Sequence, residues 1–229
     1  MRTALCFQDG NFVGREYFAR LAEAGRRPDR VAAVGRMKPE SVARELERTG
    51  GLWNPPALPA GAIDRRFESS ADPALASWLR DEAIDVAIQG GVGILRDAVL
   101  AAPRIGWLNV HPGALPAYRG NACPEWAVLE GEDVVATAHL IDAGIDTGPV
   151  VCAARYTIEP GWSYAAFRAN LYAHCARVLI AALDRLAAQG AAAAEPQSAT
   201  GACYRAAMDA TGLARVMALF PIDTSSRRR

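Results

Sequence analysis

Short apolar runs alternate with helical repeats through the first half of the chain. Four runs have the length and composition of buried strands: residues 3–7, 31–34, 85–89 and 105–110. Apolar residues recur at helical spacing in the segments between and beside them: residues 14–24, 39–49, 70–82 and 96–102. Asp72 is a candidate N-cap for the third helix, with Pro73 at its first position. This alternation predicts an α/β fold, in which helices cover both faces of a mostly parallel sheet.

The second half of the chain has a different pattern. Two longer apolar runs, 134–141 and 149–156, are separated by a loop rich in glycine and aspartate, which predicts a strand hairpin. One long helix with an apolar stripe is expected over 163–189. We therefore predict one main domain over residues 1–189, followed by a linker and a small C-terminal extension over 190–229.

The composition narrows the class of protein. Hydrophobic residues make up 51% of the 229 residues and charged residues 22%, so the chain can bury a sizeable core. Lys and Arg balance Asp and Glu at 25 each, which gives no electrostatic reason to expect a nucleic-acid partner. No apolar run approaches the ~20 residues of a membrane span, so no membrane partner is expected. The five cysteines are scattered, which favours reduced thiols in a cytoplasmic protein.

Three polar side chains follow predicted strands, where α/β sheets bind their ligands. Asn109 and His111 end one strand, and Asp146 lies in the loop after a later one. The Asn109 amide can stabilise an oxyanion, and the His111 imidazole can move a proton while the Asp146 carboxylate orients it. These residue types are also common in turns, so the pattern alone leaves a structural role open. The chain has three scattered histidines without suitably spaced carboxylates, which predicts no metal site.

Two motifs around these residues resemble the signatures of a known family. They read Asn109-x-His111-Pro-x-x-Leu-Pro-x-Tyr-Arg-Gly120 and Ile141-Asp-x-Gly-x-Asp146-Thr-Gly-Pro149. Both are similar to motifs of the folate-dependent formyltransferases, which include glycinamide ribonucleotide, methionyl-tRNA and sugar N-formyltransferases. The resemblance implies a Rossmann-like domain and 10-formyltetrahydrofolate as the formyl donor. It also implies that Asn109, His111 and Asp146 are the catalytic residues.

The same resemblance implies a pterin pocket between two loops. The expected folate-binding residues are Gly90, Gly91, Val92, Gly93, Ile94, Leu95, Ile141, Asp142, Gly144 and Ile145. Exposed main chain would pair with the ring's polar edge, and apolar side chains would form a flat wall. A dinucleotide site at the first loop is excluded, because Arg96 stands where the third glycine of that motif belongs. For His139, we favour a structural role over a catalytic one.

Features that the sequence lacks narrow the class of molecule that could accept the formyl group. The segment 8–14 lacks the serines of the phosphate turn found in glycinamide ribonucleotide enzymes. The chain after Asp146 is too short for the C-terminal barrel of methionyl-tRNA enzymes, and no regulatory domain precedes the first strand, as one does in deformylases. We therefore expect a small amine acceptor, such as an amino sugar or a specialised-metabolite amine. Hydrolysis of formyltetrahydrofolate and transfer to glycinamide ribonucleotide stay open, and family analogy suggests a homodimer.

Overall fold

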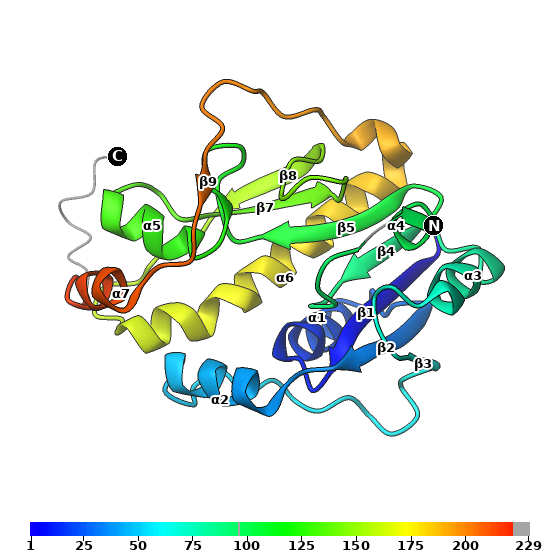
Figure 1. The fold of residues 1–229 in the computed structure, drawn as a ribbon, viewed down its shortest axis with the longest axis horizontal. Coiled ribbons are helices and arrows are strands. Elements are labelled where there is room, and N and C mark those ends of the chain that lie inside the picture. Colours follow the sequence, from blue (N-terminus) through cyan, green and yellow to red (C-terminus); the bar gives the residue numbers. More distant parts are fainter. Residues whose placement is uncertain (96, 222–229) are drawn as a thin grey trace.

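A seven-stranded sheet runs through the computed structural model, which describes residues 1–95 and 97–221 (Figure 1). Its spatial order is β3 (Arg65–Phe67), β2 (Arg30–Arg36), β1 (Thr3–Asp9), β4 (Val86–Gln89), β5 (Gly106–His111), β7 (Val135–Leu140) and β8 (Val150–Arg155). The first five strands of this order are parallel. β7 is antiparallel to both of its neighbours, which makes β7 and β8 the predicted hairpin.

Helices cover both faces of the sheet, as predicted. The α-helices of the described chain are α1 (Phe12–Glu23), α2 (Pro39–Arg48), α3 (Pro73–Asp81), α4 (Asp97–Leu100), α5 (Cys123–Glu130), α6 (Tyr164–Gln189) and α7 (Ala210–Met217). The long helix α6 packs against α1 and against β5, β7 and β8. α3 and α4 pack with each other and lie on the opposite face. Among the described residues, no helix is both long and apolar enough to cross a membrane.

Side chains that point alternately to the two faces of the central strands explain why the sheet has a hydrophobic core on each face. Leu5 and Phe7 of β1 join the cluster beneath α1 and α6, whereas Ala4 and Cys6 join the cluster beneath α3 and α4. Successive side chains of a strand point to opposite faces, so a continuous apolar run requires cover on both sides. The prediction of a mostly parallel, doubly covered sheet is thus confirmed.

Local signals set the helix boundaries where the sequence carries them. The Asp72 carboxylate accepts a hydrogen bond from the Ala74 amide at 2.9 Å, and Pro73 is the first residue of α3. The Ser163 hydroxyl caps α6 by accepting from the Ala166 amide at 3.2 Å. The helix predicted over 96–102 is shorter than expected, and Arg96 itself lies outside the described residues.

The periodicity of the sequence does not predict several elements. α5 follows Ala122, whose φ of 51° is left-handed and whose side chain provides no cap. β3 is a three-residue edge strand that begins with two exposed arginines. The remaining ones are β6 (Arg119–Gly120), which pairs with β9 (Tyr204–Arg205), the 3₁₀ helix η1 (Gly190–Ala193) and α7. The division of the chain at residue 189 stays a prediction, and residues 222–229 of the expected extension lie outside the described part.

Truncation of Trp107 tests the central position of β5. Its side chain is fully buried between β5, α3 and α4, and its indole N–H donates to the Val99 carbonyl at 2.8 Å. Trp107→Ala should lower the free energy of unfolding by about 3–5 kcal/mol, because it leaves a cavity and removes the hydrogen bond. Denaturant unfolding measures the loss. Leu52→Ala, at a site 65% exposed, should cost far less, and equal losses would contradict the fold.

Candidate active site

Strand β5 presents Asn109 and His111 on one face at the carboxyl end of the parallel strands. Residues two apart in a strand point the same way, so both side chains face the same region. The antiparallel neighbour β7 pairs Asn109 with His139 and His111 with Thr137. This register brings His139 to the two side chains that the sequence motif predicts.

The loop after β7 carries Asp146 back toward these residues. Asp146 has a φ of 54°, a left-handed conformation that costs a non-glycine residue roughly 1–2 kcal/mol. A Cβ atom on the following Gly148 would overlap the Leu140 carbonyl oxygen, so only glycine allows this close return of the chain. The Asp146 carboxylate accepts a hydrogen bond from the backbone amide of Gly120 at 2.9 Å.

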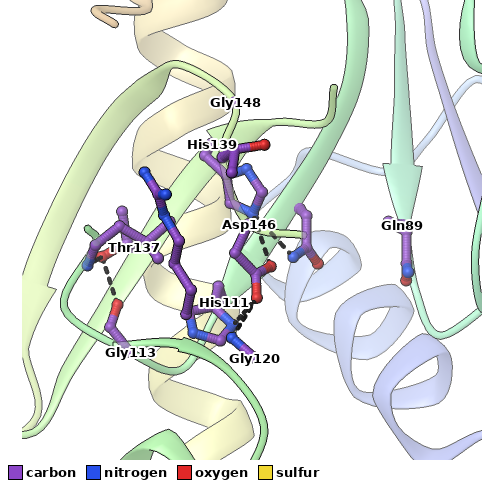
Figure 2. Close-up of polar contacts among 12 residues, drawn as sticks. Gln89, His111, Gly113, Gly120, Thr137, His139, Asp146 and Gly148 are labelled. Carbon is purple, nitrogen blue, oxygen red and sulfur yellow. Dashed lines mark hydrogen bonds and ion pairs between the residues drawn. The ribbon is translucent and has the colours of Figure 1, made fainter. Parts of the chain in front are cut away.

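His111 contacts Asp146 from within the protein. Its Nε2 lies 2.7 Å from the Tyr118 carbonyl oxygen, and its Nδ1 lies 3.4 Å from Asp146 Oδ2 (Figure 2). A carbonyl can only accept, so Nε2 carries a hydrogen and the free position of the neutral ring is Nδ1. A proton taken up at Nδ1 would therefore face the Asp146 carboxylate. This arrangement can stabilise an imidazolium.

His139 lies on the other side of the carboxylate. Its Nδ1 donates to the Leu140 carbonyl at 3.1 Å, while its Nε2 is 3.1 Å from Asn109 Nδ2 and 3.5 Å from Asp146 Oδ1. Figure 2 shows the Asp146 carboxylate between the two imidazoles. One Asn109 N–H can donate to His139, which leaves the second N–H of that amide for a ligand.

Burial and polar contacts shift the pKa values of Asp146 and His111 in opposite directions. Burial alone would raise the pKa of the Asp146 carboxyl, but contact with His139, the charge of His111 and the Gly120 amide together lower it. Burial lowers the pKa of His111, and Asp146 and the Tyr118 carbonyl offset only part of this effect. The site thus favours a carboxylate at Asp146 and a neutral imidazole at His111 until a proton arrives.

A cavity of about 130 Å³ adjoins these side chains. It is lined by Asn109, His139 and Asp146, by Gln89, and by the loop segments 93–95 and 141–145. The lining includes seven of the expected folate-binding residues: Gly93, Ile94, Leu95, Ile141, Asp142, Gly144 and Ile145. Ile94 and Ile145 are 63% and 50% exposed, so two apolar side chains stand open at this cavity.

The other three expected folate-binding residues lie elsewhere. Val92 is 3% exposed and packs into the core beneath α3, because the chain turns inward after β4. Gly90 packs against Gly14 of α1, where a Cβ atom would come within 3.1 Å of its Cα. The carbonyl of Gly91 accepts from the side chain of Asn11, the N-cap of α1. The structure thus gives these three residues packing contacts.

Two features of the site are not evident from the sequence motif. His139 touches both Asn109 and Asp146, although its sequence setting favours a structural role. A second cavity, of about 850 Å³, lies beside Asn121 and Ala122, just after the Gly120 amide that holds Asp146. Residues of α2, α5, α6 and α7 line it. The alternation of Thr137 and His139 in β7 with Ile141, just after the strand, is the sequence signal that indicates the direction of the His139 side chain.

Comparison with known proteins identifies the family. The profile of the family described as formyl transferase matches residues 24–183. This chain belongs to the formyl transferase family. A methionyl-tRNA formyltransferase of Deinococcus radiodurans is 34% identical over 185 residues, which are 76% of this chain and 56% of the relative. The chain therefore spans about half the length of the curated relatives that it matches.

Solved structures of this family share the fold. Glycinamide ribonucleotide transformylase 1 from Symbiobacterium toebii superposes with a TM-score of 0.58 at 23% identity, over 82% of this chain and 88% of its own. The formyltransferase PseJ from Anoxybacillus kamchatkensis, in complex with UDP-4,6-dideoxy-4-formamido-L-AltNAc and tetrahydrofolate, gives a TM-score of 0.50 at 15% identity. That match covers 90% of this chain and 85% of PseJ. These likenesses confirm the Rossmann-like sheet.

Replacement of Asp146 tests the electrostatics of the site through stability. The folded-state pKa of Asp146 lies below that of an unfolded carboxyl, about 3.9. Its contribution to stability is therefore complete above that value and is lost as the pH falls through the folded-state pKa. Asp146→Asn should lower the free energy of unfolding by about 1–3 kcal/mol at neutral pH, with the difference shrinking in acid.

Urea unfolding at about pH 7 and about pH 3 measures this difference. Asp184→Asn is the matched control, because that carboxylate is 46% exposed and its ion pair with Arg26 lies at the surface. The control should show little loss at either pH. An equal loss for Asp146→Asn at both pH values would show that its charge does not stabilise the site.

Proposed function

We propose that this chain transfers a formyl group from 10-formyltetrahydrofolate to the amine of a small acceptor, such as an amino sugar or a specialised-metabolite amine. The observation that carries the proposal is the cavity in which Asn109, His139 and Asp146 face the two loops expected to bind folate. Membership of the formyl transferase family supports the reaction. The tetrahydrofolate in the PseJ complex supports the donor.

The first cavity suits the pterin end of the donor. Its volume of about 130 Å³ has room for a ring system but not for the whole molecule, so the remainder would extend past Ile94 and Ile145. Those exposed apolar side chains would gain burial against a flat ring. The irregular segments 93–95 and 141–145 offer main-chain polar groups for the ring's edge.

Asn109 is proposed to stabilise the oxyanion. Attack of an amine on the formyl carbon makes the carbonyl oxygen negative, and the free Asn109 N–H can donate to it. The amide is already oriented by its contact with His139 at 3.1 Å, so little reorganisation is needed when the charge develops.

Asp146 and His111 are proposed to move the protons as a pair. Asp146 lines the cavity with 14% of its side chain exposed, whereas His111 lies behind it at 6%. The attacking amine would lose its proton toward Asp146, with His111 Nδ1 able to hold a proton against the carboxylate. The nitrogen of the departing tetrahydrofolate gains a proton as its bond to the formyl carbon breaks. The products are a formamide and tetrahydrofolate.

The second cavity is proposed to bind the acceptor. Its volume of about 850 Å³ is in the range that holds a small-molecule ligand. Arg44 and Arg48 of α2 line it together with Glu125 of α5, and Met208 and Phe220 supply apolar surface. It adjoins Asn121, one residue after the Gly120 amide that holds Asp146. An acceptor bound there would approach the carboxylate from the side opposite the folate loops.

Formylation of methionyl-tRNA is the second candidate, because curated relatives with that name match 76–77% of this chain. Hydrolysis of the donor and transfer to glycinamide ribonucleotide are further alternatives at the same site. In each case Asn109 and Asp146 keep the proposed roles and the acceptor changes. The expected homodimer stays a prediction.

A turnover assay separates these functions. The protein is incubated with 10-formyltetrahydrofolate alone, and then with amino-sugar nucleotides, with other small amines, with glycinamide ribonucleotide or with methionyl-tRNA. We expect tetrahydrofolate to appear only with a small amine and to match formamide one for one in mass spectrometry. Tetrahydrofolate and formate without any amine would contradict transfer in favour of hydrolysis.

Asn109→Ala should lower kcat in that assay by about 10²–10³-fold, because the oxyanion loses its donor. Asn170→Ala, the same change at an exposed position of α6, is the matched control and should retain turnover. Full activity of Asn109→Ala would show that Asn109 does not stabilise the oxyanion.

A further inference from the structure

A segment outside the region that the family profile matches is hydrogen-bonded to both loops of the proposed active site. Residues 195–206, which we call the C-terminal strap, follow η1 and lie outside the matched region 24–183. Figure 1 shows the strap, in orange, running from the end of α6 to β9 beside α5. Glu195 pairs with Val150, just after the Asp146 loop, through two backbone hydrogen bonds of 2.7 and 2.8 Å.

The other end of the strap binds the chain that follows His111. The Cys203 amide donates to the Pro116 carbonyl at 3.1 Å, and the Arg119 amide donates to the Cys203 carbonyl at 3.0 Å. The Asn121 amide then donates to the Arg205 carbonyl at 2.9 Å. The strap therefore bridges two loops that are far apart in the sequence.

Gln197 makes the direct contact between the strap and the Asp146 loop. Its amide nitrogen donates to the Asp146 carbonyl at 2.9 Å and to the Gly148 carbonyl at 2.7 Å. Its amide oxygen accepts from Arg119 Nε at 3.2 Å and Nη2 at 2.7 Å. Both N–H groups and the carbonyl of one side chain are thus engaged, and they join the Asp146 loop to β6.

We propose that Gln197 is a positioning residue that fixes the backbone of Asp146 and so keeps its carboxylate against His111. Asp146 has a left-handed φ of 54°, which the backbone leaves readily unless its surroundings hold it. The Gly120 amide that binds the carboxylate belongs to β6, and Arg119 of the same strand binds Gln197. One side chain therefore links the backbone of Asp146 to the strand whose Gly120 amide binds the Asp146 carboxylate. The catalytic consequence rests on the proposed function.

A displacement of the Asp146 carboxylate can be measured through the pKa of a neighbouring histidine. The titratable groups that face it are His111 from β5, His139 from β7 and Cys123 from α5. The charge of Asp146 raises the pKa of His111 against the effect of burial. If the carboxylate moves away, His111 should titrate at a lower pH.

The test is a histidine NMR titration of wild type and Gln197→Ala. The chain has only three histidines, so their ring signals can be resolved and assigned by replacement. We expect the His111 midpoint to fall by about half a pH unit or more in the variant. His174, which contacts the Ala154 carbonyl from α6, is an internal reference and should not move. In the turnover assay, kcat should fall about tenfold or more, because the carboxylate is misplaced.

The acid limb of the kcat profile should also move to higher pH in Gln197→Ala. Asp146 would lose the contacts that lower its pKa, so it would be protonated at a higher pH. A purely structural role would reduce the folded fraction without moving either pH midpoint. Gln189→Ala, at the exposed end of α6, is the matched control and should resemble wild type.

A second variant covers the case in which Gln197→Ala does not fold. Gln197→Met keeps the length of the side chain without adding a charge but removes the amide that binds the Asp146 and Gly148 carbonyls and Arg119, so the same fall in the His111 midpoint is expected. An unchanged His111 midpoint in either folded variant would overturn the proposal. The NMR result needs no turnover, so failure of wild type to transfer formyl groups would reject the proposed function and leave this test intact.

Discussion

The antiparallel pairing of β5 with β7 is the contact on which the whole site depends. In a sheet that is otherwise parallel up to β5, this reversal places His139 directly opposite Asn109. It also ends β7 at Leu140, so the next residues can return across the site and bring Asp146 to His111.

The polar groups at this junction stabilise one another. A buried carboxylate is costly unless it is paired or hydrogen-bonded. Asp146 accepts from the Gly120 amide and lies 3.4 and 3.5 Å from the imidazoles of His111 and His139, either of which could pair with it once protonated. The hydrogen bond from His111 Nε2 to the Tyr118 carbonyl fixes the orientation of the imidazole ring. The site is therefore ordered before any ligand binds, which is the condition under which fixed dipoles stabilise a developing charge. The smaller cavity is lined by Asp146, and the larger one begins at Asn121, one residue after the amide that binds this carboxylate.

Periodicity and motif spacing predict the parts of the molecule that depend on local chemistry. Alternating apolar runs predict the main sheet and its helices, and the caps at Asp72 and Ser163 mark true helix starts. Among the motif residues, His111 contacts Asp146, and Asn109 lines the same cavity as Asp146. Val92 shows the limit of prediction from sequence. Nothing in the local sequence determines whether an apolar residue after a strand lines a cavity or packs into the core, as Val92 does.

Long-range contacts explain what the sequence does not reveal. His139 becomes part of the site only through the register of β7 against β5. Gln197 reaches Asp146 across 51 positions of sequence, in a segment whose composition resembles a linker. α5 begins without a capping side chain, and Pro124 in its first turn is the local signal for its start.

The most direct test of the account follows the formyl carbon itself. The protein is given 10-formyltetrahydrofolate labelled in that carbon, together with the panel of amines, and the label is traced by NMR in wild type and in Asp146→Asn. We predict that wild type places the label in a formamide on one small amine and that Asp146→Asn does so much more slowly. Label found only in formate, or equal transfer by the two proteins, would contradict it.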